Sequence, residues 1–148
     1  MCKIRQISIF VENKPGRLRE MTNILKENEI DIRAVSISDT KDFGILRVIV
    51  NDPEKACLAL KEADCTVTIT DVLAVGIKDS PGGLFTVMDS LYNNGISVEY
   101  MYAFVSKSDD YACVILRVSD NDKTAKILAD SGVKLYTSEE IYEMWGFN

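Results

Sequence analysis

The sequence predicts an α+β protein in which two β-α-β-β-α-β units follow one another along the 148 residues. Two observations support this fold class. A shift of 66 residues places NKPGRL at 13–18 on DSPGGL at 79–84, which indicates an internal repeat. Each half also alternates segments of apolar period two, typical of half-buried strands, with segments of helical period. We expect the two units to cover 1–71 and 72–148.

The repeat extends beyond the Pro-Gly segments. With the same shift, Leu18 falls on Leu84 and Leu25 falls on Leu91. The segment around SKSDD then requires a slip of four residues, after which two copies of the string LRV coincide. Apolar positions and turn residues match together, so a duplicated unit of about 70 residues is the simplest interpretation.

The first unit opens with a strand, because Ile7, Ile9 and Val11 alternate with polar residues. A helix is predicted after Pro15-Gly16, where apolar residues recur at helical spacing. Pro15 suits the first turn of this helix, since its missing N–H would have no partner there in any case.

Two strands are predicted next, IDIRAVSIS at 30–38 and FGILRVIV at 43–50. DPEKACLALKEA then starts a second helix, with Asp52 as N-cap and Pro53 at the first helical position. CTVTIT at 65–70 closes the unit as a strand and leads almost directly into the first strand of the second unit.

The second unit repeats this order of strands and helices. Its predicted elements lie at 72–77, 84–94, 96–106, 111–118, 122–132 and 133–137. The segment from Thr137 is expected to form a short C-terminal helix, with Thr137 and Glu140 in a capping box. Ile141, Met144 and Trp145 would form its apolar side.

A β-α-β-β-α-β unit of this size is the ferredoxin-like arrangement, an antiparallel sheet with both helices on one face. The other face of such a sheet normally meets water and should be polar. In this chain it carries Tyr111, Cys113 and Ile115 in the second unit, and Ile45 and Ile49 in the first. We therefore expect the other unit, a second chain or a partner to cover it.

Composition excludes several function classes. The net charge of −6 and pI of about 4.7, without a Lys or Arg cluster, argue against nucleic acid as a partner. No segment approaches the roughly 20 apolar residues that span a bilayer. The N-terminal residues lack the features of a secretion signal, so we expect a cytoplasmic protein with no membrane partner.

The side chains offer little for catalysis. The chain has no histidine, and its four cysteines form no C-x-x-C pair, so we predict no metal site and no cofactor. Cys57 and Cys113 lie on apolar faces and are expected in the core. No nucleophile has a base beside it, and we expect no catalytic residue.

The Pro-Gly segments have a chemistry of their own. Each precedes a helix N-terminus, where free N–H groups and the helix dipole favour a small anion such as a carboxylate. Glycine allows a close approach, and Asn13 or Asp79 could accept a hydrogen bond from an ammonium group. Such a pocket fits the main chain of a free α-amino acid. The alternative is that Pro-Gly simply makes a good tight turn.

The β-α-β-β-α-β order with N-x-P-G-x-L after the first strand resembles the ACT domain, a small regulatory module that binds amino acids. Both repeats match, so the resemblance covers nearly the whole chain. The protein as a whole resembles the small stand-alone tandem ACT proteins. It implies that units pair, that a homodimer forms, and that a free amino acid binds at the seam. It also implies a metabolic enzyme that the protein regulates in trans.

The resemblance further implies the site residues. The strand-one loop of one unit would face the second strand of a neighbouring unit. The implied ligand-binding residues are Asn13, Lys14, Pro15, Gly16, Arg17, Leu18, Ser36, Ile37, Ser38, Asp79, Ser80, Pro81, Gly82, Gly83, Leu84, Tyr102, Ala103 and Phe104.

The two implied sites are not equivalent. Asp79 stands in the second unit where the family has Asn. In the first unit, Arg17 could clamp a carboxylate or merely lie along the helix surface. The second unit has Gly83 at the position equivalent to Arg17. Tyr102 and Phe104 could line a side-chain pocket, or pack in a core or interface. Two other functions stay open: a ligand-free module for protein–protein assembly, and a small enzyme on the same fold.

Overall fold

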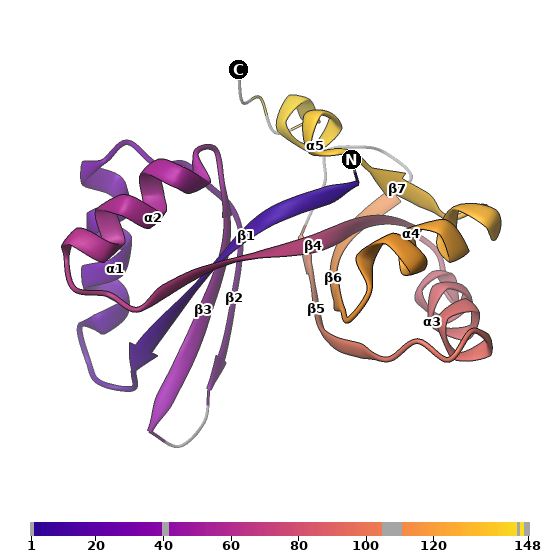
Figure 1. Ribbon diagram of the computed structural model, residues 1–148, viewed down its shortest axis with the longest axis horizontal. Coiled ribbons are helices and arrows are strands. Elements are labelled where there is room, and N and C mark those ends of the chain that lie inside the picture. The colour runs from indigo at the N-terminus through magenta and orange to yellow at the C-terminus, as the bar shows by residue number, and fades with distance from the viewer. Residues whose placement is uncertain (1, 40–41, 105–110, 145, 147–148) are drawn as a thin grey trace. The chain divides into compact units, whose positions relative to one another are not determined.

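A computed structural model describes residues 2–39, 42–104, 111–144 and 146 (Figure 1). The chain divides into two compact units. We call Arg5–Thr70 the first unit, and Asp71–Asn148 together with Met1–Ile4 the second unit. The predicted fold class is confirmed, because each unit is a ferredoxin-like βαββαβ unit with an antiparallel sheet.

The first unit contains, in chain order, β1 (Lys3–Glu12), α1 (Arg17–Glu27), β2 (Ile32–Asp39), β3 (Phe43–Val50), α2 (Pro53–Glu62) and the start of β4 (Val67–Lys78). Its strands follow the order β2-β3-β1-β4, and β3 is antiparallel to both of its neighbours. Both helices lie on one face of this sheet (Figure 1).

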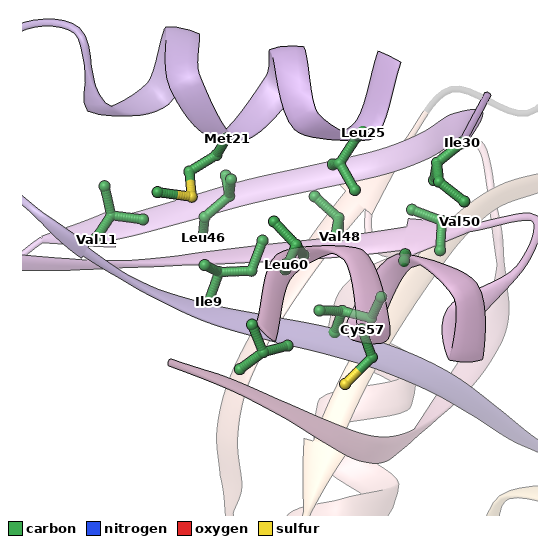
Figure 2. Close-up of a cluster of buried hydrophobic side chains, with 13 residues drawn as sticks. Ile9, Val11, Met21, Leu25, Ile30, Leu46, Val48, Val50, Cys57 and Leu60 are labelled. Carbon is green, nitrogen blue, oxygen red and sulfur yellow. The ribbon is translucent and has the colours of Figure 1, made fainter. Parts of the chain in front are cut away.

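The core of the first unit lies between the sheet and its two helices (Figure 2). Leu25 of α1 and Leu60 of α2 are fully buried, as the apolar stripes of these helices predict. They meet strand side chains that alternate along β1 and β3, among them Ile9 and Val48. The apolar residues whose alternation predicted β1 thus form the core face of the sheet.

The second unit contains the rest of β4, then α3 (Gly83–Asn93), β5 (Val98–Phe104), β6 (Tyr111–Val118), α4 (Asn121–Asp130), β7 (Lys134–Tyr136) and α5 (Ser138–Met144). The strands follow the order β5-β6-β4, with β7 on the other side of β4. The core repeats that of the first unit, with Leu91 of α3 and Leu128 of α4 buried against Leu73 and Leu116.

Two predicted helix starts are confirmed by hydrogen bonds. Asp52 Oδ1 accepts from the Lys55 N–H at 3.1 Å, and Pro53 is the first residue of α2. In the capping box of α5, the Thr137 N–H donates to Glu140 Oε2 at 2.8 Å, and the Glu140 N–H donates to Thr137 Oγ1 at 3.1 Å. These bonds satisfy donors that have no partner inside the helix.

Two sequence assignments are corrected. Pro15 is not in the first turn of a helix, because α1 begins at Arg17 with Gly16 as its N-cap. The strands predicted at 65–70 and 72–77 are one continuous strand, β4. The sequence between them lacks a residue that would end a strand, which is the physical reason. Val105 and Trp145, which the sequence placed in a strand and a helix, lie outside the described residues.

The predicted slip of four residues between the repeats is also wrong. Val48 lies opposite Ile7 in the first unit, and Leu116 lies opposite Leu73, the residue that the shift of 66 places on Ile7. Val48 therefore corresponds to Leu116, which is a slip of two. The strings LRV are similar in sequence but occupy positions two residues apart, so their arginines are not equivalent.

The residues expected on the sheet faces turned away from the helices differ in their burial. Ile49, Cys113 and Ile115 are fully buried. Tyr111 is exposed, and Ile45 is half-buried. Cys57 is also buried, so both cysteines that were expected in the core lie there.

Candidate functional site

The segments NKPGRL and DSPGGL form the same turn. In the first unit, the Arg17 N–H donates to the Lys14 carbonyl at 3.3 Å, and Gly16 has φ 90° and ψ −13°. In the second, the Gly83 N–H donates to the Ser80 carbonyl at 3.1 Å, and Gly82 has φ 87° and ψ −3°. These are the geometry of a type II turn, with proline at the second position and glycine at the third.

The turn leads directly into α1 or α3. Gly16 and Gly82 are the N-caps, and no side chain caps either helix. The first N–H groups of a helix have no internal partner, and they carry the positive end of its dipole. A Cβ at Gly16 or Gly82 would have no atom within 4 Å, so open space lies beside both turns. Each turn therefore offers an accessible, uncapped helix start.

The charged residues near the first turn are paired with one another. Glu12 Oε2 lies 3.0 Å from Lys14 Nζ and 3.8 Å from Arg17 Nη2. The hydrogen bond and charge of Lys14, followed by the charge of Arg17, lower the pKa of the Glu12 carboxyl. Arg17 Nη1 also donates to Glu20 Oε2 at 2.9 Å. The guanidinium that the sequence offered for a ligand carboxylate is thus held by two protein carboxylates.

A cavity of about 320 Å³ lies beside this turn, within the first unit. Arg17 is the one implied ligand residue that lines it. The lining residues are Phe10, Val11, Glu12, Arg17, Glu20, Met21, Phe43, Ala63, Asp64, Cys65 and Thr66. Burial, and then the charges of Glu20 and Asp64, raise the pKa of the Cys65 thiol. Three carboxylates and one guanidinium make this cavity acidic.

A cavity of about 350 Å³ lies beside the second turn, within the second unit. Its lining residues are Gly76, Ile77, Lys78, Ser80, Pro81, Gly82, Gly83, Thr86, Val87, Tyr111, Ser131, Gly132, Val133 and Lys134. Four implied ligand residues, Ser80 to Gly83, are among them. Two lysines and no carboxylate line this cavity, so it favours an anion.

The two cavities occupy equivalent positions, but their side chains differ. Gly76 corresponds to Phe10 and Gly83 to Arg17, by the shift of 66. The second cavity is therefore lined by backbone where the first carries large side chains. A Cβ on Gly83 would approach the Lys78 carbonyl oxygen to 2.2 Å, so glycine is required at this position.

The lysines of the second cavity differ in their surroundings. Lys134 Nζ lies 3.7 Å from Glu140 Oε1 and 5.3 Å from the centre of the Tyr136 ring. Its charge is thus partly balanced inside the unit. Lys78 is exposed at the end of β4, next to the turn. We regard Lys78 as the cation better placed to attract a ligand.

The implied strand residues do not line either cavity. Ser36, Ile37 and Ser38 lie on β2, where Ser38 Oγ accepts from Arg47 Nη1 at 2.8 Å. Tyr102, Ala103 and Phe104 lie opposite β6 residues on β5. Asn13, Lys14, Pro15, Gly16, Leu18, Asp79 and Leu84 also lie outside the two linings. Their contact with a ligand stays a prediction.

The sequence reasoning missed the loop between α4 and β7. Ser131, Gly132 and Val133 form one wall of the second cavity, and Ser131 Oγ lies 2.9 Å from Ser90 Oγ. The equivalent loop of the first unit has the same backbone turn, because Asp64 (φ 63°) and Gly132 (φ 78°) both take the left-handed conformation. Gly and Asp are residues that tolerate this conformation.

No helix among the described residues is long and apolar enough to cross a membrane. The described residues also contain no cluster of three or more His, Cys, Asp or Glu side chains that could hold a metal ion. The fold and the turns define a tandem ferredoxin-like module with a helix-start cavity in each unit.

The family model described as ACT domain pair matches residues 2–145, and the chain belongs to this family. An ACT domain pair is a regulatory module. None of the curated proteins compared with the chain matches it.

Solved structures agree with this fold. Protein BT0572 from Bacteroides thetaiotaomicron is 40% identical, with a TM-score of 0.88, over 95% of this chain and 96% of that chain. The ligand-free regulatory subunit of aspartate kinase from Thermus thermophilus has a TM-score of 0.61 at 14% identity, over 86% of this chain and 91% of that chain. The subunit from Thermus flavus has a TM-score of 0.62 at 14% identity, over 89% and 94%. The latter two support the fold.

Proposed function

We propose that this protein is a cytoplasmic regulatory protein that binds a free amino acid at its Pro-Gly turns and has no catalysis of its own. One observation carries the proposal: the cavity of the second unit joins an uncapped helix start to two lysines, with no carboxylate in its lining. The α-carboxylate of an amino acid is the anion that fits there. Its ammonium group could donate to the hydroxyls of Ser80 or Ser131, or to the nearby carboxylate of Asp79.

The second unit is proposed as the stronger site. In the first unit, Arg17 is paired with Glu12 and Glu20, and Asp64 adds a further negative charge to the cavity. An amino-acid carboxylate would meet repulsion there. Residues of a neighbouring unit, such as Tyr102 or Phe104 on β5, would complete the side-chain pocket in a homodimer. The bound amino acid would then control an enzyme in trans.

A thermal-shift screen of the protein against the twenty amino acids is the primary test. A ligand at about 100 times its dissociation constant stabilises the folded state by roughly 2.7 kcal/mol. We expect one amino acid, or a few related ones, to raise the melting temperature by several degrees. If none does so, and calorimetry also detects no binding, the proposal fails and a ligand-free assembly module becomes the better interpretation.

Ser80→Glu locates the site. The new carboxylate would stand beside the start of α3, where the helix dipole favours it, so folding stability should be kept. A ligand carboxylate would be repelled, and we expect at least tenfold weaker binding by calorimetry. Lys14→Glu is the matched control, because Lys14 occupies the same turn position in the first unit. This variant should leave the affinity of the second unit for the amino acid unchanged. Equal losses in both variants would contradict the assignment to the second unit.

A further inference from the structure

Lys134 is shared by two cavities of the second unit. It lines the cavity beside the second turn, and it also lines a groove of about 320 Å³ formed by β7 and α5. The other residues of this α5–β7 groove are Tyr136, Glu140, Glu143 and Met144. One lysine therefore borders both the proposed ligand and the helix that follows β7 (Figure 1).

The stem of Lys134 has a fixed course. Lys134 lies opposite Gly76 in the pairing of β4 with β7. A Cβ on Gly76 would come within 2.9 Å of Lys134 Cγ and 3.1 Å of the Tyr136 hydroxyl oxygen, so the lysine stem packs directly on the glycine backbone. In the first unit, Phe10 stands at the position of Gly76 and Thr66 at that of Lys134, and the Phe10 N–H donates to the Thr66 carbonyl. The crossing of a lysine over a glycine thus belongs to the second unit.

The ammonium group of Lys134 is held more loosely than its stem. Lys134 Nζ lies 3.7 Å from Glu140 Oε1, which is an ion pair but too long for a hydrogen bond. The two side chains are 48% and 46% exposed, and exposed ion pairs are weak. A carboxylate that accepts a hydrogen bond from this ammonium group is therefore a better partner than Glu140.

Glu140 has a second contact, at the start of α5. Its Oε2 accepts from the Thr137 N–H at 2.8 Å, and its own N–H donates to Thr137 Oγ1 at 3.1 Å. The next residue of α5, Ile141, is fully buried. One carboxylate thus caps α5 and pairs with Lys134 of β7. If Lys134 left, the capping box would stay, but one contact between α5 and β7 would be lost.

We propose that Glu140 and the carboxylate of the ligand compete for Lys134, so that α5 regulates the site of the second unit. In the ligand-free protein Lys134 is paired with Glu140, and Lys78 attracts the anion. In the bound protein Lys134 turns to the ligand, and the α5–β7 groove keeps Glu140 and Glu143 without the lysine charge. Coupling of this kind is reciprocal: the pair with Glu140 weakens ligand binding, and the ligand loosens α5.

This inference rests on the proposed function for the identity of the ligand, but its test needs only a carboxylate. The probe is acetate, and its affinity is measured from the nuclear magnetic resonance shifts of the Gly82 and Gly83 amides during a titration. In Glu140→Gln the glutamine keeps the capping box and removes the charge. We expect this variant to bind acetate about two- to fivefold more tightly, the range that an exposed ion pair allows.

Two further variants separate competition from a general effect of charge. Glu139→Gln makes the same change in net charge on the same helix, but Glu139 lines neither cavity and accepts a hydrogen bond from Ser138. Its acetate affinity should equal that of the wild type. Lys134→Met keeps an unbranched stem and removes the ammonium group, so it should bind acetate more weakly. In the Lys134→Met background, Glu140→Gln should have no further effect.

Hydrogen exchange tests the reciprocal effect. Acetate should speed exchange of the α5 amides in the wild type and leave it unchanged in Glu140→Gln. Circular dichroism checks that each variant is folded. Equal acetate affinities in the wild type and Glu140→Gln would overturn the inference, as would an equal gain in Glu139→Gln or unchanged Gly82 and Gly83 shifts in every protein.

The outcomes also separate this inference from the proposed function. An amino acid that raises the melting temperature would leave the proposed function standing, even if Glu140→Gln had no effect on acetate. Competition between acetate and Glu140 without binding of any amino acid would support the inference and refute the proposed function.

Discussion

At the scale of single residues, the surroundings of Cys113 change the pKa of its thiol. It lies on β6 and is fully buried. Burial in the apolar sheet raises the pKa of its thiol to about 12. Burial also raises the pKa of Tyr136 on β7, and the Cys113 thiol adds to this effect. Both groups are therefore neutral in the folded protein at a pH where they would ionise in the unfolded chain.

This burial predicts a pH dependence of stability. The unfolded thiol ionises near pH 9, and the folded one near pH 12, so between these values the unfolded state binds fewer protons. The free energy of unfolding should thus be undiminished by this group below about pH 8.5, and should fall as the pH rises toward 12. In Cys113→Val, urea unfolding should show a shallower fall over this window. Equal slopes in the two proteins would contradict the burial of the thiol.

Residue-level prediction from sequence worked where one physical requirement dominates. Cys57 and Cys113 were assigned to the core from the apolar pattern around them, and both are buried. Arg17 shows the limit, because its pairing with Glu12 and Glu20 depends on the geometry of the turn. Gly83 was treated as a missing arginine, whereas the close Lys78 carbonyl oxygen requires a residue without Cβ.

At the scale of elements, each Pro-Gly turn contains one position whose backbone conformation favours glycine. Gly16 and Gly82 have positive φ, which costs a residue with Cβ roughly 1–2 kcal/mol. Asn tolerates this conformation better than Ala does. Substitutions at these glycines therefore test the turn itself, since they would affect stability and ligand binding together.

The turn predicts an order of stabilities. Gly82→Ala should lower the free energy of unfolding by about 1–2 kcal/mol, and Gly82→Asn by less, because open space surrounds the position and only the backbone conformation is strained. Gly83→Ala should cost at least as much, since its Cβ would collide with a carbonyl oxygen. Urea unfolding of the three variants checks this order. If Ala and Asn were equivalent at position 82, the left-handed conformation would not be the cause.

The order of elements was predictable, but the register was not. Caps such as Asp52 and Thr137 are local signals, and the structure confirms them. The slip between the repeats was predicted wrongly because it was placed by the match of the two LRV strings. The correct slip follows from the pairing of β3 with β1 and of β6 with β4, which the sequence does not show. The wall formed by Ser131 and Gly132 comes from tertiary packing, which no local motif specifies.

At the scale of the whole molecule, the chain has a separate core in each unit. Leu60 and Leu128 are fully buried residues of the second helix in their respective units. β4 contributes to both cores, since Val67 belongs to the first and Leu73 and Val75 to the second. Each unit is thus a candidate for a separate cooperative region.

Two cores predict two patterns of hydrogen exchange. Leu60→Ala and Leu128→Ala should each destabilise the affected unit by about 2–5 kcal/mol. Native-state exchange should show lost protection mainly in β1–β3 for Leu60→Ala, and mainly in β5 and β6 for Leu128→Ala. A uniform loss along the whole chain in both variants would mean that the two units open as one.

The type II turn also has a consequence for how the two halves of such a gene can diverge. Its conformation rests on proline and glycine backbone at two positions, and the neighbouring side chains at Asn13 and Asp79 do not cap the helices that follow. After duplication, mutations at Asn13 or Asp79 would change the stability of the fold little. One copy could therefore acquire a new chemical preference while the other kept the ancestral one, or lost it, without either half ceasing to fold.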